Sequence, residues 1–170
     1  MKDIYVQFKK KSTAKEIKGE SLDDGHKDKT WLEVSSFSHG IVQPRSATAS
    51  SAGGHTAERC EHLPMVFTKD VDTSSVYLWE ACSAGYQYDV QIEFFRANGT
   101  NRIKYLQVNL TNAIVEKVDM TVPMTGLPIE TFALKYSKVV WKHTGSKTDG
   151  TTGTNDTGGW DLATNKAAAA

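Results

Sequence analysis

The sequence predicts an all-β (mainly β) fold that bends toward closure, with one flanking α-helix at about residues 73–84 and a long extended loop after the second strand. Several segments alternate apolar and polar side chains with a period of two, as Ile4, Val6 and Phe8 do, which is typical of strands with one buried face. Only the segment from Asp72 to Gly85 combines the start and stop signals of a helix. The alternation also shifts phase within the longer segments, and such shifts bend sheets toward closure.

A long polar connection follows the amino-terminal strand. From Ser12 to Lys29 the chain is rich in charged side chains, and only Ile17 and Leu22 are expected to hold it to the body. A second strand is predicted from Trp31 to Val42, where aromatic and β-branched residues alternate with polar ones. Pro44 ends this strand, since proline donates no hydrogen bond to a sheet.

The extended loop after this strand is the candidate functional segment. Between Arg45 and Gly54 no side chain after the arginine is larger than threonine, so these residues have almost nothing to bury. Ordering one backbone residue costs about 1–2 kcal/mol, so the loop should be either mobile or ordered by a partner. Strand character returns from His55 to Phe67, but both faces stay polar as far as His62, so we expect residues 55–62 to project from the body or meet a partner.

The helix has clear caps in the sequence. Asp, Thr and Ser at positions 72–74 are candidates for its amino-terminal cap, and Gly85 suits the left-handed residue that commonly ends a helix. Val76, Trp79 and Cys82 lie near one face of the helix, and we expect this face to pack on the sheet.

The remaining strands are long. Tyr86 to Arg96 and Ile103 to Val118 should form a hairpin through an Asn-Gly turn, and the phase shift near Asn112 predicts a bulge. A last strand is predicted from Ile129 to Thr144. Residues 146–170 are rich in Gly and Thr, and we expect them to be a flexible tail beyond a single domain of residues 1–145.

Composition excludes several functions. Twenty basic and twenty acidic side chains give a net charge of zero, which does not favour nucleic-acid binding. No apolar run is long enough for a signal peptide or a membrane span, so we expect a cytoplasmic start and no membrane insertion. The two cysteines, Cys60 and Cys82, are too few for a disulfide scaffold.

Metal binding or hydrolysis is the alternative reading of the segment after the loop. His55, Glu58, Cys60 and His62 are all ligand types, but on a strand the last three would span about 13 Å while His55 points the other way. We therefore expect no metal, no cofactor and no enzymatic activity, and we keep a site built from His55, Cys60 and His62 as the alternative. The aspartates that flank His26 are expected to form a solvated acidic loop.

Assembly is the sharper hypothesis for the loop, and a mobile loop without a partner is its alternative. Strand-forming polar segments joined by a small-residue loop offer backbone donors and acceptors that a second copy can pair, and head-to-tail contacts then close into rings or open into filaments. The small residues allow two backbones to approach closely, and the charged ones can set the register. The candidate interface residues are Gln43, Pro44, Arg45, Ser46, Ala47, Thr48, Ala49, Ser50, Ser51, His55, Glu58 and Arg59.

A combination of motifs runs along nearly the whole chain: MKDIYVQF at the start, IKGES with His26 after it, WLEVSSFSHGI, QPRSATASSAGGHTAERCEH, LWEACSAG and LPIETFALKY. In their order and content these motifs resemble the haemolysin-coregulated protein (Hcp) family, the inner-tube proteins of bacterial type VI secretion.

The resemblance implies a barrel-like fold of two β-sheets with one flanking helix. It also implies a homohexameric ring and a stack of such rings inside a contractile sheath, beneath a VgrG-type spike. It implies export to the outside of the cell without a signal peptide, with small effector proteins carried in the lumen. It also implies that the extended loop, here Gln43 to Gly54, reaches a neighbouring ring or subunit. The chain departs from the family pattern in its lysine-rich connection from Lys9 to Lys18 and in its Gly/Thr-rich end. A monomeric secreted binding protein is a further alternative.

Overall fold

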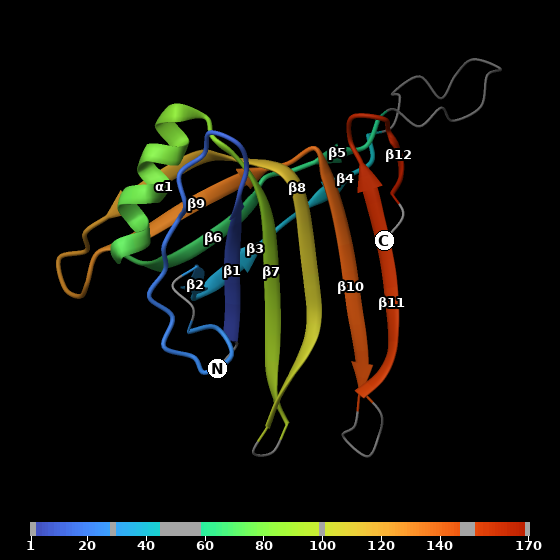
Figure 1. The fold of residues 1–170 in the computed structure, drawn as a ribbon, viewed down its shortest axis with the longest axis horizontal. Coiled ribbons are helices and arrows are strands. Elements are labelled where there is room, and N and C mark those ends of the chain that lie inside the picture. Colours follow the sequence, from blue (N-terminus) through green and yellow to red (C-terminus); the bar gives the residue numbers. More distant parts are fainter. Residues whose placement is uncertain (1–2, 28–29, 45–58, 99–100, 147–151, 169–170) are drawn as a thin grey trace.

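The computed structural model describes residues 3–27, 30–44, 59–98, 101–146 and 152–168 (Figure 1). The elements in chain order are β1 (Asp3–Lys10), β2 (Trp31–Val34), β3 (Ser36–Ser38), β4 (Ile41–Val42), β5 (Glu61–His62), β6 (Met65–Asp70), α1 (Thr73–Ala84), β7 (Gln87–Asn98), β8 (Asn101–Thr121), β9 (Ile129–Lys135), β10 (Lys138–Ser146), β11 (Thr152–Asp161) and β12 (Lys166–Ala167). The predicted all-β class with a flanking helix is confirmed.

The two layers of strands are halves of one ten-stranded sheet. Its main path runs β12-β11-β10-β8-β7-β1-β2, and a branch runs from β8 through β9 and β6 to β3. The long strand β8 joins the halves, because its first part pairs with β7 and β10 and its last part, from Ile114 to Thr121, pairs with β9. In Figure 1, β3, β6 and β9 run obliquely across the steeper β1, β7, β8 and β10.

Ser35 completes the barrel-like circuit. It is the single residue between β2, which pairs with β1, and β3, which pairs with β6. Its backbone nitrogen donates to Thr68 O at 2.8 Å. The circuit therefore runs from β8 through β7, β1 and β2, then along the chain to β3, and back through β6 and β9.

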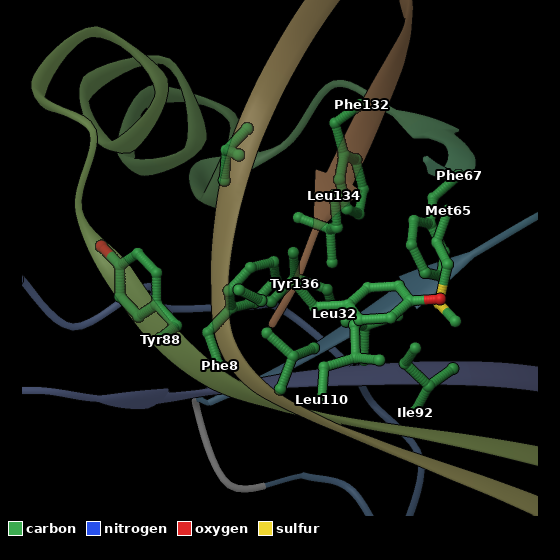
Figure 2. Packing of buried hydrophobic residues seen from close by; sticks show 14 of the residues in the cluster. Phe8, Leu32, Met65, Phe67, Tyr88, Ile92, Leu110, Phe132, Leu134 and Tyr136 are labelled. Carbon is green, nitrogen blue, oxygen red and sulfur yellow. The ribbon is translucent and has the colours of Figure 1, made fainter. Parts of the chain in front are cut away.

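The core lies inside this circuit. Figure 2 shows its side chains converging from both halves of the sheet, with Phe67 and Phe132 stacked at a centroid distance of 4.9 Å. The predicted alternation in β7 is confirmed, because Tyr88, Val90, Ile92 and Phe94 are all buried. The residues labelled in Figure 2 are Phe8, Leu32, Met65, Phe67, Tyr88, Ile92, Leu110, Phe132, Leu134 and Tyr136.

The bulge predicted near Asn112 is also present. Asn112 has a positive φ of 52°, and the pairing of β7 with β8 shifts between Tyr88 and Val90. The hairpin joins Asn98 to Asn101, while the predicted turn residues 99–100 lie outside the described residues. The bulge separates the part of β8 that pairs with β10 from the part that pairs with β9.

Two predicted long strands are divided in the structure. The segment from Trp31 to Val42 forms β2, β3 and β4, because the chain changes partner from β1 to β6 at Ser35 and leaves the main sheet before Ile41. The segment from Ile129 to Thr144 forms β9 and β10, which pair with different parts of β8. Local patterns do not show where a strand changes partners.

The predicted flexible tail is wrong for residues 152–168. β11 pairs with β10 over nearly its full length, with Val139 opposite Trp160, and β12 pairs with β11. Trp160 and Leu162 pack against the core as half-buried side chains. The neighbouring strand supplies hydrogen bonds to the backbone, and threonine suits a pleated surface, so the Gly/Thr composition does not prevent a strand.

The helix has the predicted ends but a different packing face. Asp72 is the N-cap with a capping box to Ser75, and Gly85 is left-handed with φ 65°. Ser74, Ser75, Leu78 and Ala81 are buried instead of Val76, Trp79 and Cys82. Val76 is 61% exposed and Trp79 37%, while Cys82 is half-buried and packs against the core.

The connection before β2 is only partly as predicted. Ile17 is fully buried, but Leu22 is 94% exposed. The predicted solvated acidic loop is wrong at His26, which is buried, stacks on Tyr5 at 4.0 Å and contacts Asp23 Oδ1 at 2.6 Å and Glu93 Oε2 at 3.0 Å. Glu93 lies on β7, far along the chain, so the sequence near His26 gave no sign of this partner.

This cluster predicts a dependence of stability on acid. Burial raises the pKa of Glu93, but hydrogen bonds from Lys104, His26 and Gln91 outweigh it and hold the pKa below its usual value; bonds from His26 and Arg102 act likewise on Asp23. A carboxyl with a lowered folded-state pKa stabilises the fold above its ordinary pKa of about 4 and loses this contribution as pH falls. Urea unfolding between pH 7 and 3 should show a falling free energy, and Glu93→Gln should show a shallower fall. An unchanged slope in Glu93→Gln would contradict this account.

Candidate functional site

The structure describes the base of the extended loop. Of the twelve predicted interface residues, Gln43, Pro44 and Arg59 are described. The other nine lie outside the described residues and keep their status as predictions: Arg45, Ser46, Ala47, Thr48, Ala49, Ser50, Ser51, His55 and Glu58. We call residues 39–44 and 59–63 the arm root.

The arm root is a small antiparallel ribbon separate from the main sheet. Ile41 pairs with His62 and Val42 with Glu61, and Leu63 N donates to Gly40 O at 2.9 Å. Figure 1 shows β4 and β5 beyond the ends of β3 and β6, close to the upper ends of β10 and β11. A ribbon of two-residue strands has little stability of its own, so its position depends on contacts with the body.

A tyrosine between two histidines makes that contact. The hydroxyl of Tyr136 lies 2.8 Å from His62 Nδ1 and 3.0 Å from His39 Nε2. Tyr136 follows β9 and is buried among the core side chains, as Figure 2 shows. The two histidines come from opposite sides of the ribbon, so one phenol holds both sides of the arm root to the core.

Burial favours the neutral forms of these three side chains. Burial lowers the pKa of His62 and of His39, and a proton on His62 lowers the pKa of His39 further. Burial, with a smaller effect from Cys60, raises the pKa of Tyr136 far above the neutral range. The phenol then donates to one ring nitrogen and accepts from the N–H of the other ring.

A cavity of about 490 Å³ lies between the arm root and the sheet. Its lining is mostly apolar and includes two tryptophans, and Trp160 Nε1 is the one buried side-chain nitrogen or oxygen without a partner among the described residues. Ile41, Val42 and Leu63 of the arm root are 48%, 46% and 41% exposed. The lining residues are Ile41, Gln43, Cys60, His62, Trp141, Gly159, Trp160 and Asn165. The arm root therefore carries an exposed apolar surface next to this cavity.

The alternative metal or hydrolytic site gains no support from the described residues. His62 Nδ1 is engaged by Tyr136, and Cys60 is half-buried. The part of the chain that the structure describes has no group of three or more His, Cys, Asp or Glu side chains placed to hold a metal ion, and His55 lies outside that part.

The sequence did not indicate the roles of His39 and Tyr136. Tyr136 ends the motif LPIETFALKY, where the alternation predicts only a core position. Its hydroxyl partners are 74 and 97 residues away in the chain, a separation that no local pattern can bridge.

Comparisons with known proteins agree with this fold. A family profile described as type VI secretion system effector, Hcp, matches residues 5–143. A search of curated proteins gave no significant match. Within the described residues, no helix has the length and apolar character needed to cross a membrane.

Solved structures share the fold over almost their whole length. A type six secretion system protein has a TM-score of 0.84 at 24% identity, covering 99% of this chain and 100% of its own. Hcp1 from Salmonella typhimurium has a TM-score of 0.75 at 24% identity, covering 98% and 99%. Hcp1 from an E. coli pathovar has a TM-score of 0.72 at 22% identity, covering 94% and 98%.

Proposed function

The chain belongs to the Hcp family of type VI secretion proteins, and we propose that it is a structural subunit of the secretion tube. Six copies form a ring, and rings stack into a tube that leaves the cytoplasm without a signal peptide. The tube contacts the contractile sheath and a VgrG-type spike, and its lumen carries small effector proteins. The protein acts without a cofactor and is not an enzyme.

The arm root is the observation that supports this proposal most directly. The chain leaves the main sheet before Ile41 and returns to it at Met65, with a separate ribbon between these points. The described ends of the loop, Pro44 and Arg59, lie outside the strands of the main sheet, and we propose that a second copy contacts the loop between them. We assign ring-to-ring contacts to the twelve residues predicted from the sequence, from Gln43 to Ser51 with His55, Glu58 and Arg59.

Deletion of Ser46 to Ala52 tests the assignment. The variant should keep the fold and the ring, because the deleted residues contribute no large apolar side chain, but it should form no tubes and support no secretion. Light scattering measures the ring, with an expected mass of about six times the 18.7 kDa chain, and electron microscopy measures the tubes. Leu22→Ser is the surface control, because this side chain is 94% exposed and lies on the connection between β1 and β2.

The two measurements separate the possible failures. Tubes of normal length from the deletion variant would remove the loop from the stacking interface. A wild-type mass of one chain would overturn the ring itself and favour a monomeric binding protein.

A further inference from the structure

We propose that His39, Tyr136 and His62 form a proton-sensitive latch that holds the arm root against the β-body at neutral pH and releases it in mild acid. The latch is defined by these three side chains. The proposal goes beyond the tube function, since it concerns the attachment of the arm root within one subunit and requires no neighbour.

The hydrogen bonds of the latch are complete only while at least one of the two rings is neutral. A phenol has one hydrogen to donate and can accept, so it can link an unprotonated nitrogen of one ring to the N–H of the other. The two observed contacts, 2.8 Å to His62 Nδ1 and 3.0 Å to His39 Nε2, fit this chain. When both rings are protonated, both nitrogens donate and the phenol hydrogen loses its acceptor in the cluster.

Protonation also places two positive charges close together. The ring centroids of His39 and His62 are 6.1 Å apart in a half-buried site, where water screens charge less than at the surface. His26 shows the opposite design, because carboxylate oxygens of Asp23 and Glu93 contact its two nitrogens. His39 and His62 instead contact the phenol of Tyr136, which carries no negative charge to balance a proton.

The charged groups around the latch offer little compensation. The arm root itself contributes Cys60 and the exposed Glu61, and β9 contributes Lys135, which is paired with Glu116 of β8 at 2.7 Å. β10 and β11 contribute the uncharged Trp141 and Trp160, which line the cavity next to His62. Among the described residues, the ion pairs of histidine with a carboxylate involve His26 and neither latch histidine, so a second proton in the latch gains little compensation.

The direction and range of the response follow from burial. Burial lowers the pKa of both histidines, so the fold favours their neutral forms. The latch is then complete above the ordinary histidine pKa of about 6.5 and is lost as pH falls below it. The ribbon itself has only two-residue strands, so loss of the latch hydrogen bonds removes a large share of the contacts that hold it in place.

Hydrogen exchange at pH 7.5 and pH 5.0, corrected for intrinsic rates, tests the proposal on the purified full-length protein. The amides of Val42, Glu61 and Leu63 occupy the hydrogen-bonded positions of the ribbon. They should exchange about tenfold faster at pH 5.0, the change expected when one or two hydrogen bonds are lost. Peptides from β7 should keep their protection, which separates local release from global unfolding. Tyr136→Phe removes only the hydroxyl, so its arm root should exchange fast at both pH values.

The decisive variant carries His39→Gln and His62→Asn. Gln at position 39 places its amide near the position of His39 Nε2, and Asn at position 62 places its amide near that of His62 Nδ1. Hydrogen bonding to the phenol is therefore retained without a titrating ring. This variant should lose the acid response, while His143→Asn, at an exposed histidine, should keep it. Equal wild-type exchange at both pH values, or a full acid response in the double variant, would overturn the latch.

Discussion

The Lys69→Met variant should lose about 3–5 kcal/mol of its free energy of unfolding, because it leaves a buried carboxylate without its positive partner. Lys69 is 1% exposed and Glu130 is fully buried, and Lys69 Nζ lies 2.9 Å from Glu130 Oε1. Methionine has a similar length and fills the same space, so the loss reports the missing charge. Urea unfolding followed by circular dichroism measures it.

Glu130 also holds the helix in place. Ser75 Oγ donates to it at 2.7 Å and Trp79 Nε1 at 3.1 Å, both from α1. Lys69 contacts the N-cap carboxylate of Asp72 at 2.7 Å, so the start of the helix is tied to β6 and β9 by one polar cluster. This cluster explains why Ser74 and Ser75 are buried while Val76 is exposed.

A double variant separates charge from packing. Lys69→Met with Glu130→Gln removes both charges. The single amide oxygen of Gln can accept from Trp79 Nε1 while its NH2 group donates to Ser75 Oγ, so the variant should recover most of the lost stability. A single Lys69→Met variant within about 1 kcal/mol of wild type, the range of an exposed ion pair, would show that Glu130 is not left uncompensated.

The difference between local signals and partners that are distant in the chain explains how far the sequence predicts the fold. The helix ends depend on Asp72 and Gly85, whose effects act within a few residues, and the faces of β7 depend on simple alternation, so both were predictable. The partner of Lys69 is 61 residues away, and the partner of His26 is 67 residues away. In a local pattern these residues look like exposed charges.

The candidate site divides in the same way. The absence of large side chains after Arg45 identifies the loop as a segment without a core of its own, and this is a local property. The attachment of the arm root depends on Tyr136 meeting His39 and His62 in space, which requires β9 to lie beside β6. The strand character of β11 depends on the edge offered by β10, which its own composition does not show.

The Gly19→Ala variant should lose about 3 kcal/mol, at the upper end of the usual cost of overpacking. A Cβ on Gly19 would overlap the carbonyl oxygen of Trp31 and lie 3.0 Å from Leu32 N, and both groups are backbone atoms of β2 that cannot move aside like the end of a flexible side chain. The connection passes this close because Ile17, two residues earlier, is fully buried in the core.

Gly25→Ala is the matched control for this change. It adds the same methyl group to the same connection, but the new Cβ would meet only Asp23 Oδ1 at 3.4 Å, an ordinary contact, so its effect should stay within about 0.5 kcal/mol. Thermal and urea unfolding of the two variants measure the difference. Equal stability of the two variants would contradict this prediction. It would mean that the connection, which also carries the contacts of His26 with Asp23 and Glu93, can move away from β2 at no cost.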